Sequence, residues 1–342
     1  GRVQDPRSAL ELGGGIHRSE LWAGFAPAAL LPDPDWVEEP ADEFDVAHLH
    51  LGLSAMSSVA LFHLIVRLRA CAKPVVLTVH NLEHPCVEQA LLDELLRVAV
   101  PSADEIVTFT VGAGREILRR WGRAAHILPH PPVILDEPPR APRAPGHGFV
   151  VGIAVTQHCG LAEPWETVEA AARALHGSPD SSLRVLIDPA LVAEDDSSPC
   201  PTLRERAREL ASLGVIELSE HEQLGVHELA AFLRGLDAFV VPRHRASHSS
   251  WIEACYDVAT TVITPDRGFY REQRTCLTYP LASPDGLDGA LRTARRMRRD
   301  RTAPVDELAA ELEFIVRAHR ELYLSLIDAA AGDSPSRELL AT

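Results

Sequence analysis

Residues 236–273 are the part of the chain whose residue types and spacing could best do chemistry. An apolar run over 238–241 predicts a buried parallel strand. A polar loop follows, and Ser249 and Ser250 can then cap a helix that carries Glu253 one turn in. The unpaired backbone N–H groups of such a helix start attract a phosphate, and a nearby carboxylate accepts hydrogen bonds from sugar hydroxyls. The stretch therefore predicts a site for a nucleotide sugar.

Other candidate ligands for a phosphate lie in the loops on either side of this helix. Arg243, Arg245 and His248 precede it, and Trp251 stands in its first turn. Gly268, after the next predicted strand, would allow the backbone to approach a ligand closely. For Arg243 and Arg245 a second interpretation stays open, because two arginines on a surface loop are often only solvated.

Two further stretches with few charged groups are candidate ligand-binding loops. The strand predicted over 149–155 ends in a loop where Thr156 and His158 are polar candidates and where no arginine or lysine occurs. Near the start of the chain, Gly14 is the middle of three consecutive glycines that would let backbone approach a ligand. An ordinary loop is the competing interpretation, because no clear strand precedes these glycines.

Histidines stand at the ends of two predicted strands in the first half. His80 follows the apolar run over 75–77, and His48 and His50 end the strand before it. An imidazole at such a place can hydrogen-bond a sugar hydroxyl or donate to a phosphate. His80 is the strongest candidate of the three, although a histidine at a strand end is often a purely structural residue.

Composition excludes several classes of partner. The net charge is -16, with 33 basic and 49 acidic residues, which argues against nucleic acid and anionic membranes as partners. No apolar run reaches the roughly 18 residues of a transmembrane helix, and no secretory signal is recognisable, so we expect a cytoplasmic protein. The six cysteines form no CxxC pair, and we expect no metal site. Oligomeric state is not predicted.

The chain divides into two α/β halves. Residues 136–148 are rich in proline, glycine and arginine and predict a linker. On each side strands alternate with helices, which predicts two Rossmann-like domains facing each other across a cleft. We assign residues 1–140 to an acceptor-side domain and 148–317 to a nucleotide-sugar domain, and residues 318–342 are a candidate helix to pack back on the first. Strands are predicted at 44–50, 74–80, 105–110, 125–128, 149–155, 183–187, 215–218, 238–241, 260–263 and 277–279.

Over nearly its whole length the chain resembles the GT-B glycosyltransferases, and most closely glycosyltransferase family four and its bacterial relatives. The resemblance is carried by four passages: DVAHLHLG at 45–52, PVVLTVHNLEHP at 74–85, ILPHPP at 127–132 and the segment 236–273, which is similar to a bacterial THSGWLEAC variant. It implies a retaining, metal-independent transfer of a sugar from a UDP- or GDP-sugar to a small-molecule acceptor. It implies no tightly bound cofactor.

The resemblance also assigns roles to residues. Glu253 matches the family's second signature glutamate, which holds the ribose, and His80 matches its histidine near the donor sugar. Three departures stand against it. Arg245 replaces the first signature glutamate, Ala259 replaces a usual glycine, and the loop over 156–160 lacks the family's basic pair. The alternative is therefore a catalytically impaired GT-B protein that acts as a sugar-nucleotide binding or partner subunit. A GT-B epimerase or phosphorylase is a third reading.

Overall fold

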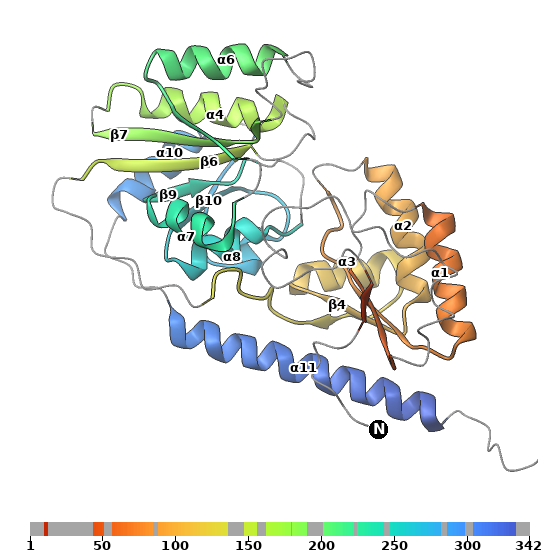
Figure 1. The fold of residues 1–342 in the computed structure, drawn as a ribbon. Helices are drawn as coiled ribbons and strands as arrows, with labels where there is room; N and C mark the ends of the chain where they lie inside the picture. The colour runs from red at the N-terminus through yellow and green to blue at the C-terminus, as the bar shows by residue number, and fades with distance from the viewer. Residues whose placement is uncertain are drawn as a thin grey trace, which may run out of the picture.

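The computed structural model describes twelve stretches of the chain in detail: 10–12, 44–50, 57–84, 88–135, 147–155, 162–178, 180–189, 201–221, 224–242, 247–281, 286–297 and 304–332. They form two parallel sheets, each with helices against it (Figure 1). The prediction of an α/β protein with two Rossmann-like units is confirmed.

The first sheet runs in chain order, and every strand pair in it is parallel. Its strands are β1 (Leu10–Leu12), β2 (Ala47–His50), β3 (Val75–Thr78), β4 (Glu105–Thr108) and β5 (His126–Ile127). Three helices connect them: α1 (Ser58–Ala70), α2 (Gln89–Ser102) and α3 (Val111–Trp121). The side chains of Ser57 and Thr110 begin α1 and α3 by accepting a backbone N–H three residues on, which satisfies one unpaired donor in each helix.

The apolar strands of this sheet are buried on both faces. Val75 and Leu77 of β3 pack in the core beneath α1 and α2, whereas Val76 points to the opposite face. Successive side chains of a strand alternate between faces, so a continuous apolar run is what a doubly covered parallel sheet requires. This is why the run over 75–77 predicted the strand.

The second sheet is also parallel and has the order β11-β10-β9-β6-β7-β8. Its strands are β6 (Phe149–Val155), β7 (Ser181–Ile187), β8 (Glu217–Glu220), β9 (Ala238–Val240), β10 (Thr261–Pro265) and β11 (Leu277–Tyr279). Its helices are α4 (Ala162–Leu175), α6 (Pro201–Ser212), α7 (Val226–Arg234), α8 (Ser250–Asp257), α9 (Tyr270–Gln273) and α10 (Gly286–Arg296). The strand order reverses between β6 and β9. Ligands of open parallel sheets bind beyond the carboxyl ends of strands at such a switch point.

The last helix, α11 (Val305–Gly332), runs past both sheets (Figure 1). Near its start Glu307 accepts a hydrogen bond from Tyr256 Oη at 3.0 Å. Further along, Leu322 and Tyr323 pack against the face of the first sheet that is opposite α1, α2 and α3. One continuous helix thus contacts both units. None of the helices in the described ranges is long and apolar enough to cross a bilayer.

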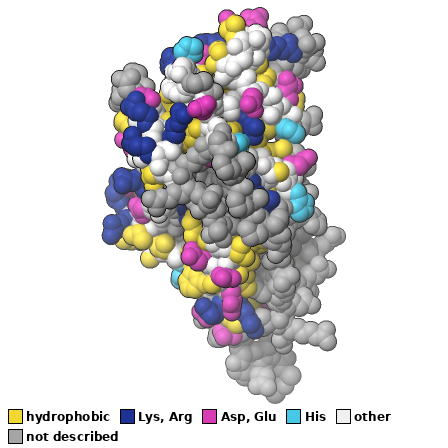
Figure 2. Space-filling view, turned by 90° about the vertical axis from the view of Figure 1, so that its left-hand side faces the viewer, with side chains coloured by type: hydrophobic (Ala, Val, Ile, Leu, Met, Phe, Trp, Pro, Cys, Tyr) yellow, Lys and Arg dark blue, Asp and Glu magenta, His cyan; other side chains and the backbone are white. Residues whose placement is uncertain are grey.

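Charges of both signs lie together on the surface. On the face drawn in Figure 2, basic and acidic side chains are interspersed. A mixed distribution of this kind gives that face no continuous basic field of the sort that follows a phosphate backbone.

The structure corrects two expectations about local structure. A strand, β1, does precede the glycine run, and it pairs in parallel with β2. Three residues are too few for a periodic signal, so only pairing reveals this strand. Helices α9 and α10 were not predicted, although α10 buries Leu287, Leu291 and neighbouring alanines at helical spacing.

Candidate functional site

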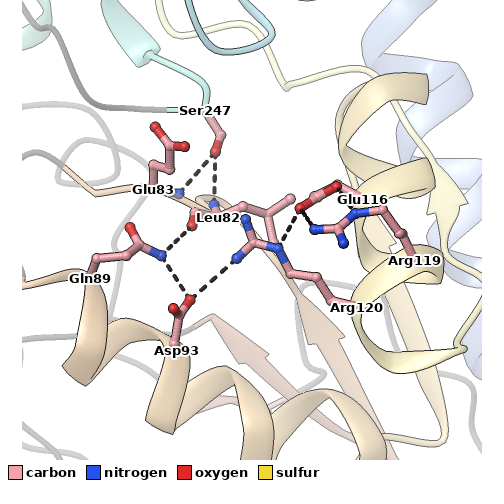
Figure 3. A network of polar contacts seen from close by, with 8 residues as sticks. All are labelled: Leu82, Glu83, Gln89, Asp93, Glu116, Arg119, Arg120 and Ser247. Carbon is pink, nitrogen blue, oxygen red and sulfur yellow. Dashed lines mark hydrogen bonds and ion pairs between the residues drawn. The ribbon is translucent and has the colours of Figure 1, made fainter.

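The loops after β3 and β9 meet, so that the carboxyl ends of the two sheets face each other. Ser247 Oγ accepts hydrogen bonds from the backbone N–H groups of Leu82 and Glu83 at 2.8 and 3.1 Å (Figure 3). In the opposite direction, Asn81 Oδ1 accepts from the N–H groups of Ser247 and His248 at 3.2 and 3.4 Å. Side chains and backbone therefore tie the two units together beside His80.

The loop after His80 is also held by its own unit. Gln89, at the start of α2, donates to the Leu82 carbonyl at 3.0 Å and to Asp93 at 2.8 Å. Arg120 of α3 donates to the same Asp93 oxygen at 3.2 Å (Figure 3). The loop consequently has fixed partners on both sides, and a small shift between the two units has to break specific bonds.

Replacing Ser247 by alanine tests this contact. The change leaves the amides of Leu82 and Glu83 without their acceptor, and Leu82 is buried. We expect a loss of about 1 to 3 kcal/mol in the free energy of unfolding, the usual cost of unsatisfied buried donors. Urea denaturation measures it. Ser212→Ala, at an exposed serine of α6, is the matched control, and equal losses in the two variants would contradict the assignment.

Both ring nitrogens of His248 form hydrogen bonds with the first unit. Its Nδ1 lies 2.8 Å from the His80 carbonyl oxygen and so must carry the proton. Its Nε2 then accepts from the Thr110 hydroxyl at 2.9 Å. Burial lowers the pKa of His248 to about 4, which keeps the ring neutral. The phosphate role predicted for His248 stays a prediction, and in this structure the ring joins the two units.

His80 lies at the meeting point of the two units and is half-buried. Its Nε2 is 2.9 Å from Nδ1 of His50, and its ring makes an edge contact with Phe109, 5.2 Å between centroids. Burial, with His248 nearby, lowers the pKa of His80 to about 4, so the ring is neutral at pH 7. Among the described residues, no hydrogen bond engages its Nδ1. That atom can therefore reach a ligand.

Phe109 organises the aromatic surroundings of this site. Its ring lies 5.2 Å from His80, 4.7 Å from His130 and 5.3 Å from His248. Burial lowers the pKa of His130 to about 3. A phenyl ring among three neutral imidazoles makes this wall apolar except for a few directed nitrogen atoms.

Glu253 is completely buried in the first turns of α8. Its Oε1 accepts from Gln273 Nε2 at 2.8 Å, and its Oε2 accepts from Arg274 Nε at 2.7 Å. Arg274 also pairs with Glu311 of α11 and lies over the Tyr256 ring at 4.2 Å. Burial raises the pKa of Glu253 to about 8 against the opposing charge of Arg274. The ribose role of Glu253 stays a prediction, and it requires Gln273 or Arg274 to move aside.

The start of α8 is held by the same residue, Gln273. The backbone N–H of Ser249 donates to Gln273 Oε1 at 3.0 Å, and Gln273 Nε2 donates back to the Ser249 carbonyl at 2.9 Å. Ser249 and Ser250 remain half-buried. Trp251 stacks on Phe239 with 4.8 Å between centroids, so its ring packs at the edge of the core.

The loop after β10 packs against the same region. Gly268 has a φ of 63°, a left-handed conformation that glycine adopts without strain. It leads to Phe269, whose N–H donates to the Ser247 carbonyl at 3.0 Å. Glu272 follows and accepts from the Gly112 N–H at 2.6 Å, at the start of α3. Gly268 therefore shapes a loop that contacts the first unit.

Five candidate residues lie outside the described residues: Gly14, Thr156, His158, Arg243 and Arg245. Residues 156–161 and 243–246 come soon after β6 and β9 in the sequence, and these are the two strands at the switch point. In the ranges that the structure describes, no three His, Cys, Asp or Glu side chains converge as metal ligands would.

Solved structures of similar fold identify the architecture. Sucrose-phosphate synthase from Thermosynechococcus elongatus matches 90% of this chain and 79% of its own, at 17% identity and a TM-score of 0.53. A UDP-forming trehalose-phosphate synthase from Burkholderia vietnamiensis matches 88% and 76%, at 15% identity and a TM-score of 0.58. Anabaena HepE matches 87% and 80%, at 13% identity and a TM-score of 0.52.

The protein has the GT-B fold. No protein-family model and no curated protein sequence matches the chain. At these identities the similarity establishes the architecture, and the chemistry has to come from the site itself.

Within the GT-B fold, sequence reasoning missed several residues that shape the site. Asn81 and Ser247 stand beside residues that were singled out, and their polar side chains next to predicted strand ends were a usable signal. Gln273 and Arg274 gave no such signal. Their contacts with Glu253 join residues 20 and 21 positions apart in the sequence, which no local pattern encodes.

Proposed function

We propose that the protein is a retaining, metal-independent glycosyltransferase that moves a sugar from a nucleotide diphosphate sugar to a small-molecule acceptor. The observation that carries the proposal is that loops at the carboxyl ends of the two sheets contact each other. His248, between β9 and α8 at the switch point of one sheet, hydrogen-bonds the carbonyl of His80, which follows β3 of the other. Anabaena HepE, which shares the fold, is a complex with UDP. UDP- and GDP-sugars are the donors proposed.

The diphosphate is assigned to the start of α8. There the backbone N–H groups of the first turn, beginning at Ser250, and the positive end of the helix dipole favour an anion, while the Ser249 N–H is held by Gln273 Oε1. Arg243 and Arg245 supply charge from the preceding loop, and His158 adds a polar group from the loop after β6. This eight-residue helix begins beside the switch point of the sheet, where ligands of open parallel sheets bind.

The other candidates are assigned by position. Glu253 serves the ribose after rearrangement of its partners, and Thr156 borders the phosphates. Gly14 and Gly268 allow close approach of backbone, and His80 contacts the donor sugar through Nδ1. Catalysis then consists of stabilising the leaving phosphate charge and an oxocarbenium-like sugar. Residues 1–140 form the acceptor side and 148–317 the donor side in this proposal.

Calorimetric titration with UDP, GDP and their sugars tests the donor site. We expect saturable binding of at least one nucleoside diphosphate, and weaker binding of the matching monophosphate, because the helix start recognises the diphosphate. Glu253→Gln keeps the size of the side chain and is expected to weaken nucleotide binding. Absence of binding by every nucleotide would refute the proposal.

Replacing His80 by alanine tests the transfer step. The variant loses the only donor group that the first unit is proposed to offer the sugar, and we expect kcat to fall about 10²- to 10³-fold, as when a directed hydrogen-bond donor is removed from a transition-state site. A sugar-release or transfer assay with mass-spectrometric detection measures kcat. His63→Ala, at an exposed histidine of α1, is the control. An unchanged kcat in His80→Ala would remove His80 from the mechanism.

One set of observations favours a second candidate, a binding or partner subunit without turnover. The loop over 156–160 contains no arginine or lysine, and both oxygens of Glu253 are already engaged. Nucleotide binding in calorimetry combined with no donor hydrolysis or transfer would support this candidate. Turnover that disappears in His80→Ala would dismiss it.

A further inference from the structure

His50 and His80 form a hydrogen-bonded pair at the ends of neighbouring strands. Nδ1 of His50 lies 2.9 Å from Nε2 of His80. Burial, together with the charges of His48 and His80, lowers the pKa of His50 well below its ordinary value, and the pKa of His80 is about 4. Both rings are therefore neutral at pH 7, and each carries a single N–H. One ring must donate and the other must accept.

The surroundings of His50 decide the direction of this bond. Its second nitrogen, Nε2, is buried and has no hydrogen-bond partner in the described part of the chain. If His80 donated, the proton of His50 would stand on Nε2 as a buried N–H without an acceptor. If His50 donates, Nε2 carries only a lone pair. Buried unpaired N–H groups are rarer than unpaired acceptors, so the second arrangement is favoured.

The neighbouring histidine holds the His50 ring without competing for its proton. The rings of His48 and His50 lie 4.2 Å apart between centroids. Both nitrogens of His48 are engaged elsewhere, with Tyr323 Oη at 2.6 Å and Thr78 Oγ1 at 2.7 Å. Because Tyr323 belongs to α11, a row of tilted and edge-on ring contacts extends from the last helix to His80.

We propose that His50 is a positioning residue that donates from Nδ1 to Nε2 of His80 and so fixes the proton of His80 on Nδ1. His80 then offers its ligand a hydrogen-bond donor. Resting on the proposed function, this predicts that the group facing His80 is an acceptor oxygen of the donor sugar or of its phosphate. It also means that Nδ1 of His80 cannot serve as a general base, because its lone pair is occupied by the proton.

The protonation of each ring is measurable in the protein without any ligand. Long-range ¹H–¹⁵N spectra of protein labelled at histidine distinguish a protonated from a bare ring nitrogen, and His80→Gln and His50→Phe assign the signals by their loss. We expect His80 protonated on Nδ1 and bare on Nε2, with His50 protonated on Nδ1. A proton on Nε2 of His80 in the unmodified protein would overturn the proposal.

The variant His50→Phe removes the donor while keeping an aromatic ring between His48 and His80. We expect the His80 signals to move toward a mixture of both tautomers, whereas His63→Gln on the exposed face of α1 leaves them unchanged. An unaltered His80 tautomer in His50→Phe would contradict the role given to His50. If this variant fails to fold, as judged by circular dichroism, the spectrum of the unmodified protein decides by itself.

Steady-state kinetics provide a second test of the role of His50, and this test depends on the proposed function. We expect His50→Phe to lower kcat about 10- to 100-fold with the donor KM within about twofold, as for other residues that orient a ligand-contacting histidine. Loss of activity with an unchanged His80 tautomer would count against the proposal. An unmodified protein without turnover would refute the glycosyltransferase assignment, and the tautomer measured in the ligand-free protein would still stand or fall separately.

Discussion

Replacing Arg274 by alanine is expected to lower the free energy of unfolding by about 3 to 5 kcal/mol. The guanidinium pairs with Glu253 and Glu311, whose side chains are 1% and 19% exposed. Removing it leaves both acidic side chains without their shared cationic partner, and breaking a buried ion pair from one side usually costs this much. The change also removes the contact of Arg274 with the Tyr256 ring.

Chemical denaturation followed by circular dichroism measures the loss. Arg271→Ala, three positions earlier on the exposed side of α9, is the matched control and is expected to change stability by less than about 0.5 kcal/mol. A further variant, Arg274→Ala combined with Glu253→Gln, should recover part of the loss because a neutral amide at position 253 needs no cationic partner. Equal stabilities of Arg274→Ala and Arg271→Ala would show that the network does not hold α8 to α11.

The stabilising effect of the neutral His248 ring is expected to shrink by about 3 kcal/mol as the pH falls from 7 to 4. In the folded protein its pKa is about 4, whereas an unfolded histidine titrates near 6.5. Between these values the unfolded chain binds more protons, so stability rises with pH across this window and is lost as the pH falls through it. The contribution is fully present above about pH 6.5.

The total pH dependence does not isolate this effect, because buried acids act in the opposite direction. Burial raises the pKa of Glu253 to about 8 and that of Asp257 to about 7, and each therefore favours the folded state at lower pH. The useful quantity is the difference in unfolding free energy between the unmodified protein and His248→Asn, measured at several pH values. A difference that does not change between pH 7 and pH 4 would contradict a neutral, buried His248.

The alternation of apolar runs and helical segments predicted the architecture because parallel sheets covered on both faces require such runs. Strands β6 and β11 have the predicted bounds, and most others differ by one to three residues at their ends. Short elements were the failures. Strand β1 has three residues and exists through its pairing with β2, so no pattern inside it was strong enough to indicate it.

The candidate site was partly predictable for the same reason. Residues at the carboxyl ends of parallel strands converge, which placed His80 and His248 in one region, and they are joined through the His80 carbonyl. What Glu253 contacts was not predictable. The sequence shows a carboxylate one turn into a helix, and only tertiary packing decides whether it faces a ligand or Arg274. The tautomer of His80 depends in the same way on His50, a residue of another strand.

A structure of the protein crystallised with UDP or GDP tests the central claim most directly. We expect the diphosphate at the start of α8, next to the backbone of Ser249 and Ser250, and the sugar end directed toward Nδ1 of His80. A nucleotide bound elsewhere on the protein, or an α8 start that stays without phosphate at millimolar nucleotide, would contradict the account.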